Sequence, residues 1–219
     1  TIVIDIILVI STCLVLLPIV TMVMTSLKTF EDVQMNPASL IPKEFTLKNY
    51  VTVFTEFPFT QYLINTLFIT ITSTIGITLT SALVAYAFSR FDFKYKGIIF
   101  AVMLSTIMIP GQILQIPLYE MYRGMGWINT YKPMIIPAFL GGGITNVFLI
   151  RQFFNSLPKS IFESAQIDGA GEFRIFATIA VPLSKAIIFT VAIFSFTASW
   201  NDFYSPLLYI NDDKKYTLA

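Results

Sequence analysis

The sequence predicts an all-helical integral membrane protein, a polytopic bundle of spanning helices. Hydrophobic residues make up 55% of the 219 residues, and charged residues only 12%, which is about half of their share in a soluble domain. The charges are also unevenly placed, because long stretches of the chain carry none. No single soluble core could bury this much apolar surface, and the low charge excludes an intrinsically disordered chain.

Five charge-free runs are candidates for spanning helices. A span needs about 17–25 apolar residues, and the five runs are 16 to 33 residues long: 6–27, 57–89, 97–119, 133–150 and 186–201. Backbone polar groups find no water inside a bilayer, so each run is expected to be helical. The runs are apolar on every face, and they lack the alternating pattern of a membrane β-barrel.

We expect residues 1–27 to form the first transmembrane helix and residues 28–60 an ordered extracytoplasmic loop. The first run is too long for a signal peptide, and no small-residue cleavage site follows it. Residues 61–219 are expected to form the main transmembrane domain, with spans near 61–88, 97–118, 133–151 and 186–209, and a cytoplasmic loop at 152–185. The loops at 89–96 and 151–185 carry Lys and Arg at the higher density, so the positive-inside rule favours them as cytoplasmic.

The chain lacks the residues that most enzymes need. It contains no His for a catalytic triad or a zinc site. It has no G-x-x-x-x-G-K-[ST] loop for ATP, and Gly141 to Gly143 lie inside a predicted span, where close helix packing is favoured over phosphate binding. A net charge of +1 argues against nucleic acid as a partner. We therefore expect no catalytic activity, no metal site and no cofactor in this chain.

The most informative segment is the loop at 152–185. Pro158 ends the preceding structure, and Ser160 with Glu163 has the spacing of a capping box at the start of a short helix. Gly169 can adopt a positive φ and stop that helix, while Asp168 or the loop can start a second helix. A short exposed helix with small residues and one acid suits docking into a partner's groove. The alternative is an ordinary solvated loop.

The same loop resembles the EAA motif of the permease subunits of bacterial ABC importers, which reads E-A-A-x3-G-x9-I-x-L-P. Glu163, Ser164 and Ala165 stand at the E-A-A positions, with Ser164 in place of the first Ala. Val181 replaces the Leu, and neither change would stop a short helix from fitting a groove. The resemblance assigns ATPase coupling to these residues of the loop: Glu163, Ser164, Ala165, Asp168, Gly169, Ala170, Ile179 and Pro182.

Other segments are similar to the carbohydrate-uptake branch of that family, and in particular to the second permease subunit of the maltose importer. They include YLINTLFIT, LVAYAFSRFDFKYKG, GWINTYKPMIIP and SWNDFYSPLLY. The resemblance runs from about residue 25 to residue 219. It implies the type I importer permease fold with six spans, of which five are present here, and we expect the sixth span to be missing from this sequence.

The resemblance also implies a set of partners and a place in the cell. They are a second permease subunit in a heterodimer, two subunits that bind ATP and Mg²⁺, and an extracytoplasmic sugar-binding protein. The chain would be a multi-pass protein of the bacterial cytoplasmic membrane and would form half of a pore for a sugar, which the resemblance implies to be an oligosaccharide. Its coupling helix, near 160–168, would dock on one ATPase, with Glu163 paired to a basic residue there.

A sugar pathway needs hydroxyl, amide and aromatic partners. The candidates in or near spans are Asn65, Gln112, Gln115, Asn146, Ser195, Ser199 and Trp200. The alternative is that these side chains bond between helices. Asp202 is either a functional intramembrane acid or an interfacial residue between Trp200 and Tyr204.

Three other functions remain open from the sequence. A permease for a non-sugar solute would share the EAA loop. A secondary transporter would show buried titratable residues and repeat symmetry, and neither is visible. Only the EAA pattern argues against a membrane scaffold.

Overall fold

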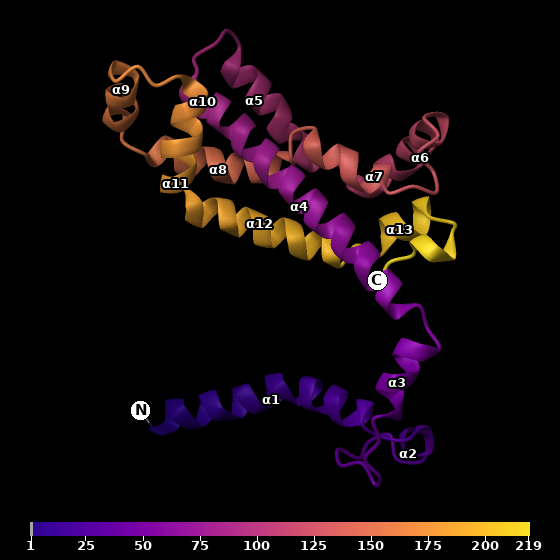
Figure 1. Ribbon diagram of the computed structural model, residues 1–219. Coiled ribbons are helices and arrows are strands. Elements are labelled where there is room, and N and C mark those ends of the chain that lie inside the picture. Colours follow the sequence, from indigo (N-terminus) through magenta and orange to yellow (C-terminus); the bar gives the residue numbers. More distant parts are fainter. Residues whose placement is uncertain (1) are drawn as a thin grey trace. The chain divides into compact units, whose positions relative to one another are not determined.

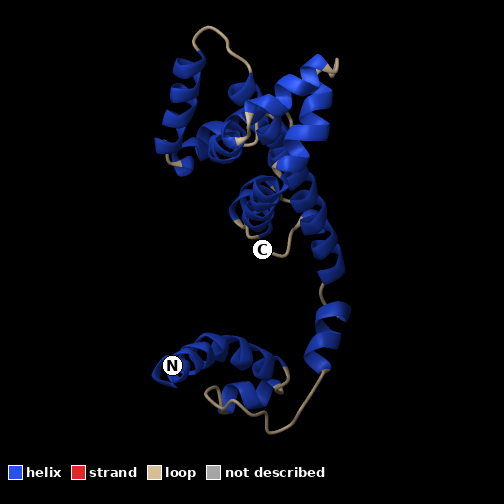
Figure 2. Cartoon of the chain, turned by 90° about the vertical axis from the view of Figure 1, so that its left-hand side faces the viewer, coloured by secondary structure: helices blue, strands red, loops and turns tan. Residues whose placement is uncertain are grey.

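The structure is a computed structural model that describes residues 2–219, and the described part consists of helices and loops without a strand (Figure 2). Its internal contacts divide the chain between Thr60 and Gln61 into two compact units. The boundary falls within the first turn of the longest helix, α4 (Phe59–Arg90). The helices of the second unit are labelled along the chain in Figure 1.

The first unit contains α1 (Ile2–Ser26), α2 (Phe30–Met35) and α3 (Lys48–Thr55). No residue of α1 is buried, and its mean hydropathy reaches 2.8, so this helix is apolar on every side, as a lipid-facing span is. The loop after it is ordered by a buried lysine. The Lys28 ammonium donates to the carbonyl oxygens of Asn36 and Ser39, and the Asn49 amide donates to the Lys28 carbonyl at 2.8 Å.

The second unit is built around α4, which is continuous over 32 residues. Helix α8 contacts both α5 and α12, and α13 contacts α7. The further elements, in chain order, are α5 (Lys96–Ser105), η1 (Thr106–Met108), η2 (Gly111–Leu114), α6 (Gln115–Gly124), α7 (Lys132–Ile135), η3 (Ile136–Phe139), α8 (Ile144–Ser156), α9 (Lys159–Ile167), α10 (Glu172–Ile175), η4 (Phe176–Ala180), α11 (Val181–Leu183), α12 (Lys185–Trp200), α13 (Tyr204–Tyr209) and η5 (Asp213–Lys215).

Three helical segments are long and apolar enough to cross a membrane: Ile2–Ser26, Phe59–Arg90 and Lys132–Ser156, the last of which is interrupted between η3 and α8. Two further helix pairs pass the same test but are bent, by 91° between Lys96–Met108 and Gly111–Gly124, and by 82° between Glu172–Leu183 and Lys185–Trp200. The described residues therefore provide three spans, or up to five if each bent pair counts as one. The straight helices expected near 97–118 and 186–209 are not continuous.

The first of these breaks has a local cause. Ile109 adopts an extended conformation (φ −85°, ψ 114°) because it precedes Pro110, whose ring disfavours the helical region for the residue before it. Ser184 leaves helical geometry (φ −107°, ψ 16°) two residues after Pro182. At the far end of α12, the helix stops at Trp200, and α13 begins only at Tyr204.

The glycine run at 141–143 interrupts the expected span at 133–151. All three glycines have positive φ (121°, 67° and 84°), so the chain leaves the helix between η3 and α8. Gly142 packs directly on α4, since a Cβ atom there would collide with the Ser81 hydroxyl and the Ile77 carbonyl oxygen. The expectation of close packing is therefore confirmed at Gly142, whereas the expectation of a continuous helix through the run is wrong.

We predict that Gly142→Ala destabilises the protein strongly, because it combines steric overlap with a backbone conformation that alanine disfavours. The expected loss is about 2–5 kcal/mol, seen as a lower unfolding temperature in detergent and a smaller monodisperse fraction on size exclusion. Gly111→Ala is the matched control, since its φ is not in the left-handed region and its Cβ would meet nothing within 4 Å. Equal stability of the two variants would contradict this account of the break.

Candidate functional site

Helix α9 lies at one end of the second unit, and α6 and α13 lie at the other end (Figure 1). Helix α9 begins directly after Pro158. The extended conformation of Pro158 (φ −58°, ψ 130°) sets the direction in which the chain enters the helix. No side chain caps the helix, and Ser160 lies inside it as its second residue. The expected capping box between Ser160 and Glu163 is therefore wrong, because the helix starts two residues earlier than that box requires.

The end of α9 is closed by a Schellman motif. The Ala170 amide donates to the Ala165 carbonyl and the Gly169 amide to the Gln166 carbonyl, both at 3.0 Å. Gly169 has a φ of +77°, which this turn requires and a residue with a Cβ rarely adopts. Asp168 ends α9 and does not start the next helix, α10, whose N-cap is Gly171.

The two faces of α9 differ sharply. Phe162 is 1% exposed and Ala165 8% exposed, and both belong to the apolar core that α4 and α8 share. Glu163 and Ser164 are exposed, and Ile167 is 85% exposed at the end of the helix. Ala165 thus permits a close approach of α9 to its own core and does not face a partner, which corrects its place in the expected docking surface.

A polar contact network joins α9 to α4. The Arg90 guanidinium lies 3.8 Å from the centre of the Phe162 ring. The Tyr86 hydroxyl donates to the Glu172 carboxylate at 2.8 Å, and the Gln166 amide donates to the other oxygen of that carboxylate at 2.7 Å. Sequence reasoning did not assign Tyr86, Arg90 and Glu172 to the site. The available signal was the spacing of four residues between Tyr86 and Arg90, which places both on one face of α4.

The remaining candidates for coupling lie in the segment that follows α9. Ala170 and Ile179 pack against the apolar core, while Pro182 is exposed in α11. Between α10 and α11 the chain forms the π-helical turn η4, a feature that is frequent at functional sites. Of the eight residues predicted for ATPase coupling, Glu163, Ser164 and Asp168 therefore form an outer face. The other five belong to the turn, the core and the helices that support this face.

The opposite end of α4 fixes the last residues of the chain. The buried Asn65 amide donates to the carbonyl oxygens of Lys214 and Tyr216, each at 2.9 Å, and the Thr66 hydroxyl accepts from the Leu218 amide. The Lys214 backbone amide holds the pKa of Asp212 below its usual range and so supports the same turn. Both hydrogen bonds that the Asn65 amide donates go to this segment. This favours a role for Asn65 in bonding between segments over a role in sugar binding.

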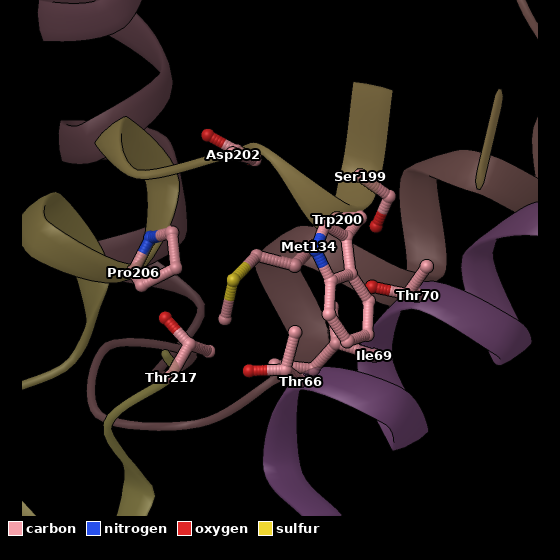
Figure 3. Close-up of a pocket in the computed structure, with 9 residues that line it drawn as sticks. All are labelled: Thr66, Ile69, Thr70, Met134, Ser199, Trp200, Asp202, Pro206 and Thr217. Carbon is pink, nitrogen blue, oxygen red and sulfur yellow. The ribbon is translucent and has the colours of Figure 1, made fainter. Parts of the chain in front are cut away.

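Ser199 and Trp200 line a small cavity together with Thr66, Thr70 and Asp202 (Figure 3). Its volume is about 10 Å³, enough for one water molecule and too small for a sugar in this conformation. The Asp202 carboxylate accepts from the Ser205 amide at 3.0 Å and thereby stabilises the start of α13. Asp202 is half-buried at a helix break, so it has a structural role in addition to its place in the cavity wall.

The other predicted pathway residues do not join this cavity. Gln112 is exposed in η2, and Gln115 is half-buried at the start of α6. The Asn146 amide donates to the Gly142 carbonyl at 2.9 Å and closes the glycine break. These side chains are thus spread over three separate elements.

A stripe of hydroxyls along α4 was missed by sequence reasoning. Within residues 2–219, the buried hydroxyls of Thr70, Thr74, Thr78 and Ser81 have no hydrogen-bond partner. The buried hydroxyl of Ser195 on α12 also has none. Their spacing of four, four and three residues places them on one face of α4, and this periodicity was the signal available in the sequence. Thr74 and Thr78 also border a groove of about 500 Å³ between α4, η4 and α12.

Broken apolar helices are a common feature of membrane transport proteins. Residues 73–214 match the family described as the binding-protein-dependent transport system inner membrane component. The chain belongs to this family. It is a permease subunit of an ABC transport system in the inner membrane, and such a subunit is a transport component and not an enzyme.

Individual relatives agree with this assignment. The chain is 33% identical over 203 residues to a probable ABC transporter permease of Pyrococcus horikoshii, a match that covers 92% of this chain and 74% of the relative. It is 30% identical to a diacetylchitobiose uptake permease of Streptomyces coelicolor (94% and 68% covered). It is 32% identical to an arabinooligosaccharide transport permease of Halalkalibacterium halodurans (92% and 72% covered).

The fold is also found in a solved structure. A bacterial ABC transporter involved in the import of the acidic polysaccharide alginate contains a chain that superposes with a TM-score of 0.88 at 22% identity, over 98% of this chain and 75% of that one. The resemblance to an ABC importer permease and the expectation of a type I all-helical membrane fold are therefore confirmed.

We predict that Gly169→Val prevents α9 from closing its Schellman turn, because valine at φ +77° is strained by about 1–3 kcal/mol. The variant should insert into the membrane normally and show faster amide exchange in residues 165–170. Gly171→Val is the control, since Gly171 has an extended backbone (φ −70°, ψ 157°) and open space at its Cβ position. Equal exchange in the two variants would show that the turn does not depend on the positive φ.

Proposed function

We propose that this permease forms half of the translocation pore of an ATP-driven sugar importer and is coupled to its ATPase through α9. The observation that carries the coupling assignment is the two-sided geometry of α9. One face is anchored by Phe162 and Ala165, and the other presents Glu163 and Ile167. A helix that is fixed on one side and exposes an apolar side chain beside an acid is suited to a groove on a partner.

In this proposal the partners are a second permease subunit in a heterodimer, two ATP-binding subunits and an extracytoplasmic sugar-binding protein. ATP and Mg²⁺ are bound by the ATP-binding subunits, and this chain holds no cofactor. When those subunits close on ATP, they displace α9, and the spans change between inward-open and outward-open arrangements. This is a two-state element that nucleotide biases.

The choice of a sugar rests on two supports. Curated relatives transport diacetylchitobiose and arabinooligosaccharides according to their names. In this chain, the stripe of unpaired hydroxyls at Thr70, Thr74 and Thr78 offers hydrogen-bonding groups without introducing charge. A buried hydroxyl without a partner is costly, and a polyhydroxylated solute that passes along α4 would satisfy it transiently.

We predict that Glu163→Lys uncouples transport from ATP hydrolysis by placing a positive charge against a basic groove. Reconstituted transporter should show solute uptake reduced by about tenfold or more, the loss that reversal of one interfacial charge pair produces. Membrane insertion should be unchanged. Glu120→Lys is the matched charge reversal, since Glu120 is exposed and only 3.6 Å from Arg123 in a surface pair. Full transport by Glu163→Lys would refute the coupling assignment.

A second prediction concerns the solute. The complete transporter, purified with its ATPase and second permease, should take up labelled oligosaccharides from a panel that also contains amino acids, polyamines and phosphate. Thr74→Val and Thr78→Val should lower sugar uptake by about threefold or more each, the effect of one lost hydrogen bond. Thr190→Val is the control, because the Thr190 hydroxyl already donates to the Ala186 carbonyl of its own helix. Uptake of only non-sugar solutes would overturn the sugar assignment.

A further inference from the structure

The Glu172 carboxylate connects three helices. Its two oxygens accept from Tyr86 on α4 at 2.8 Å and from Gln166 on α9 at 2.7 Å. Glu172 itself is the first residue of α10, so a single side chain connects the coupling helix, the following helix and the longest span. It takes part in none of the ion pairs found among residues 2–219, and both of its partners are neutral.

The Tyr86 hydroxyl is held in place by the rings around it. Tyr86 is 5% exposed, and its ring makes edge-to-face contacts with Phe154 at 6.0 Å and with Phe176 at 5.3 Å between centroids. These rings belong to α8 and η4, so the hydroxyl is fixed from two sides before it meets Glu172. A preorganised donor of this kind loses little conformational freedom when it bonds a carboxylate.

One turn further along α4, Arg90 provides a second link. Its guanidinium stacks 3.8 Å from the centre of the Phe162 ring on the buried face of α9. Arg90 thus contacts α9 directly at Phe162, and Tyr86 is linked to Gln166 of α9 through the Glu172 carboxylate. Tyr86 and Arg90 lie on one face of α4. Among the exposed residues of α9, Gln166 takes part in these contacts, whereas Glu163, Ser164 and Ile167 do not.

We propose that Tyr86, Glu172 and Gln166, together with the Arg90–Phe162 stack, form a strut that transmits displacement of α9 to α4. The inference rests on the proposed function and names the positioning residues for its coupling step. Because α4 is one uninterrupted helix, it carries this displacement to its other end, where Asn65 and Thr66 hold the segment near 214–218. Without the strut, α9 still docks on its partner and still packs on the core, but less of its displacement reaches the span.

The test is Tyr86→Phe in the complete reconstituted transporter, since this change removes one hydroxyl and keeps the ring packing. The ATPase should copurify as with the unmodified chain, and solute moved per ATP hydrolysed should fall by about three- to tenfold, the effect of one lost hydrogen bond to a carboxylate. Tyr95→Phe is the matched control, because Tyr95 is 59% exposed in the neighbouring loop and retains its ring contact with Lys94. It should leave the ratio unchanged.

A double variant separates the strut from general destabilisation. Tyr86→Phe and Glu172→Leu both remove the bond between these two side chains, so the combined variant should lower the ratio no further than the more severe single change. Amide exchange should rise in residues 159–167 and stay unchanged in α8. Multiplicative losses in the double variant, or a ratio equal to that of Tyr95→Phe, would overturn the strut.

Failure of the strut and failure of the proposed function give different results. If the unmodified chain copurifies with an ATPase and transports solute, and Tyr86→Phe behaves identically, then only the strut is refuted. If the unmodified chain retains no ATPase and moves no solute, then the proposed function is refuted, and the strut with it.

Discussion

The structure depends on one constraint, which is that backbone amides and carbonyls inside a bilayer must bond to each other because no water is present. In the second unit, α4 meets this constraint over 32 residues without a break. The other long segments are interrupted at Pro110, at Gly141 to Gly143 and at Ser184. Breaks of this kind are tolerated where protein covers the freed groups, as Asn146 does for the Gly142 carbonyl.

The uninterrupted helix organises the rest of the unit because everything else can be fixed to it. Gly142 packs on it near Ser81, Tyr86 and Arg90 bind the elements at one end, and Asn65 binds the chain terminus at the other. The polar groups of α4 thus have different roles. Those at its ends are bonded to other segments, and so are Ser73 and Thr80 in its middle turns. Four other hydroxyls of the middle turns, at Thr70, Thr74, Thr78 and Ser81, are buried without a partner among residues 2–219. Unpaired groups in the middle of a span are costly, and a passing solute would give them partners.

Much of the fold follows from the sequence because apolar runs and motif spacing are local signals. The charge-free run at 57–89 corresponds to α4, and the spacing from Glu163 to Gly169 predicts a short helix that ends in a glycine turn, as α9 does. The bend after Met108 was not predicted, although Pro110 marks it, because hydropathy averages over a break. Nor could spacing show that Ala165 faces inward, since that depends on packing against α4 and α8, which are distant in the sequence.

The candidate site therefore combines a part that local sequence encodes with a part that only tertiary contacts reveal. The outer face of α9 follows from the motif, because each residue contributes by its own chemistry and exposure. The inner face also requires contacts to α4 across a long stretch of sequence. Arg90 lies 72 residues from Phe162, and Tyr86 lies 86 residues from Glu172, whereas Glu172 is only 6 residues from Gln166. A helix that only docks needs the first part alone. A helix that moves a span also needs a rigid attachment to that span, and the contacts to α4 provide it.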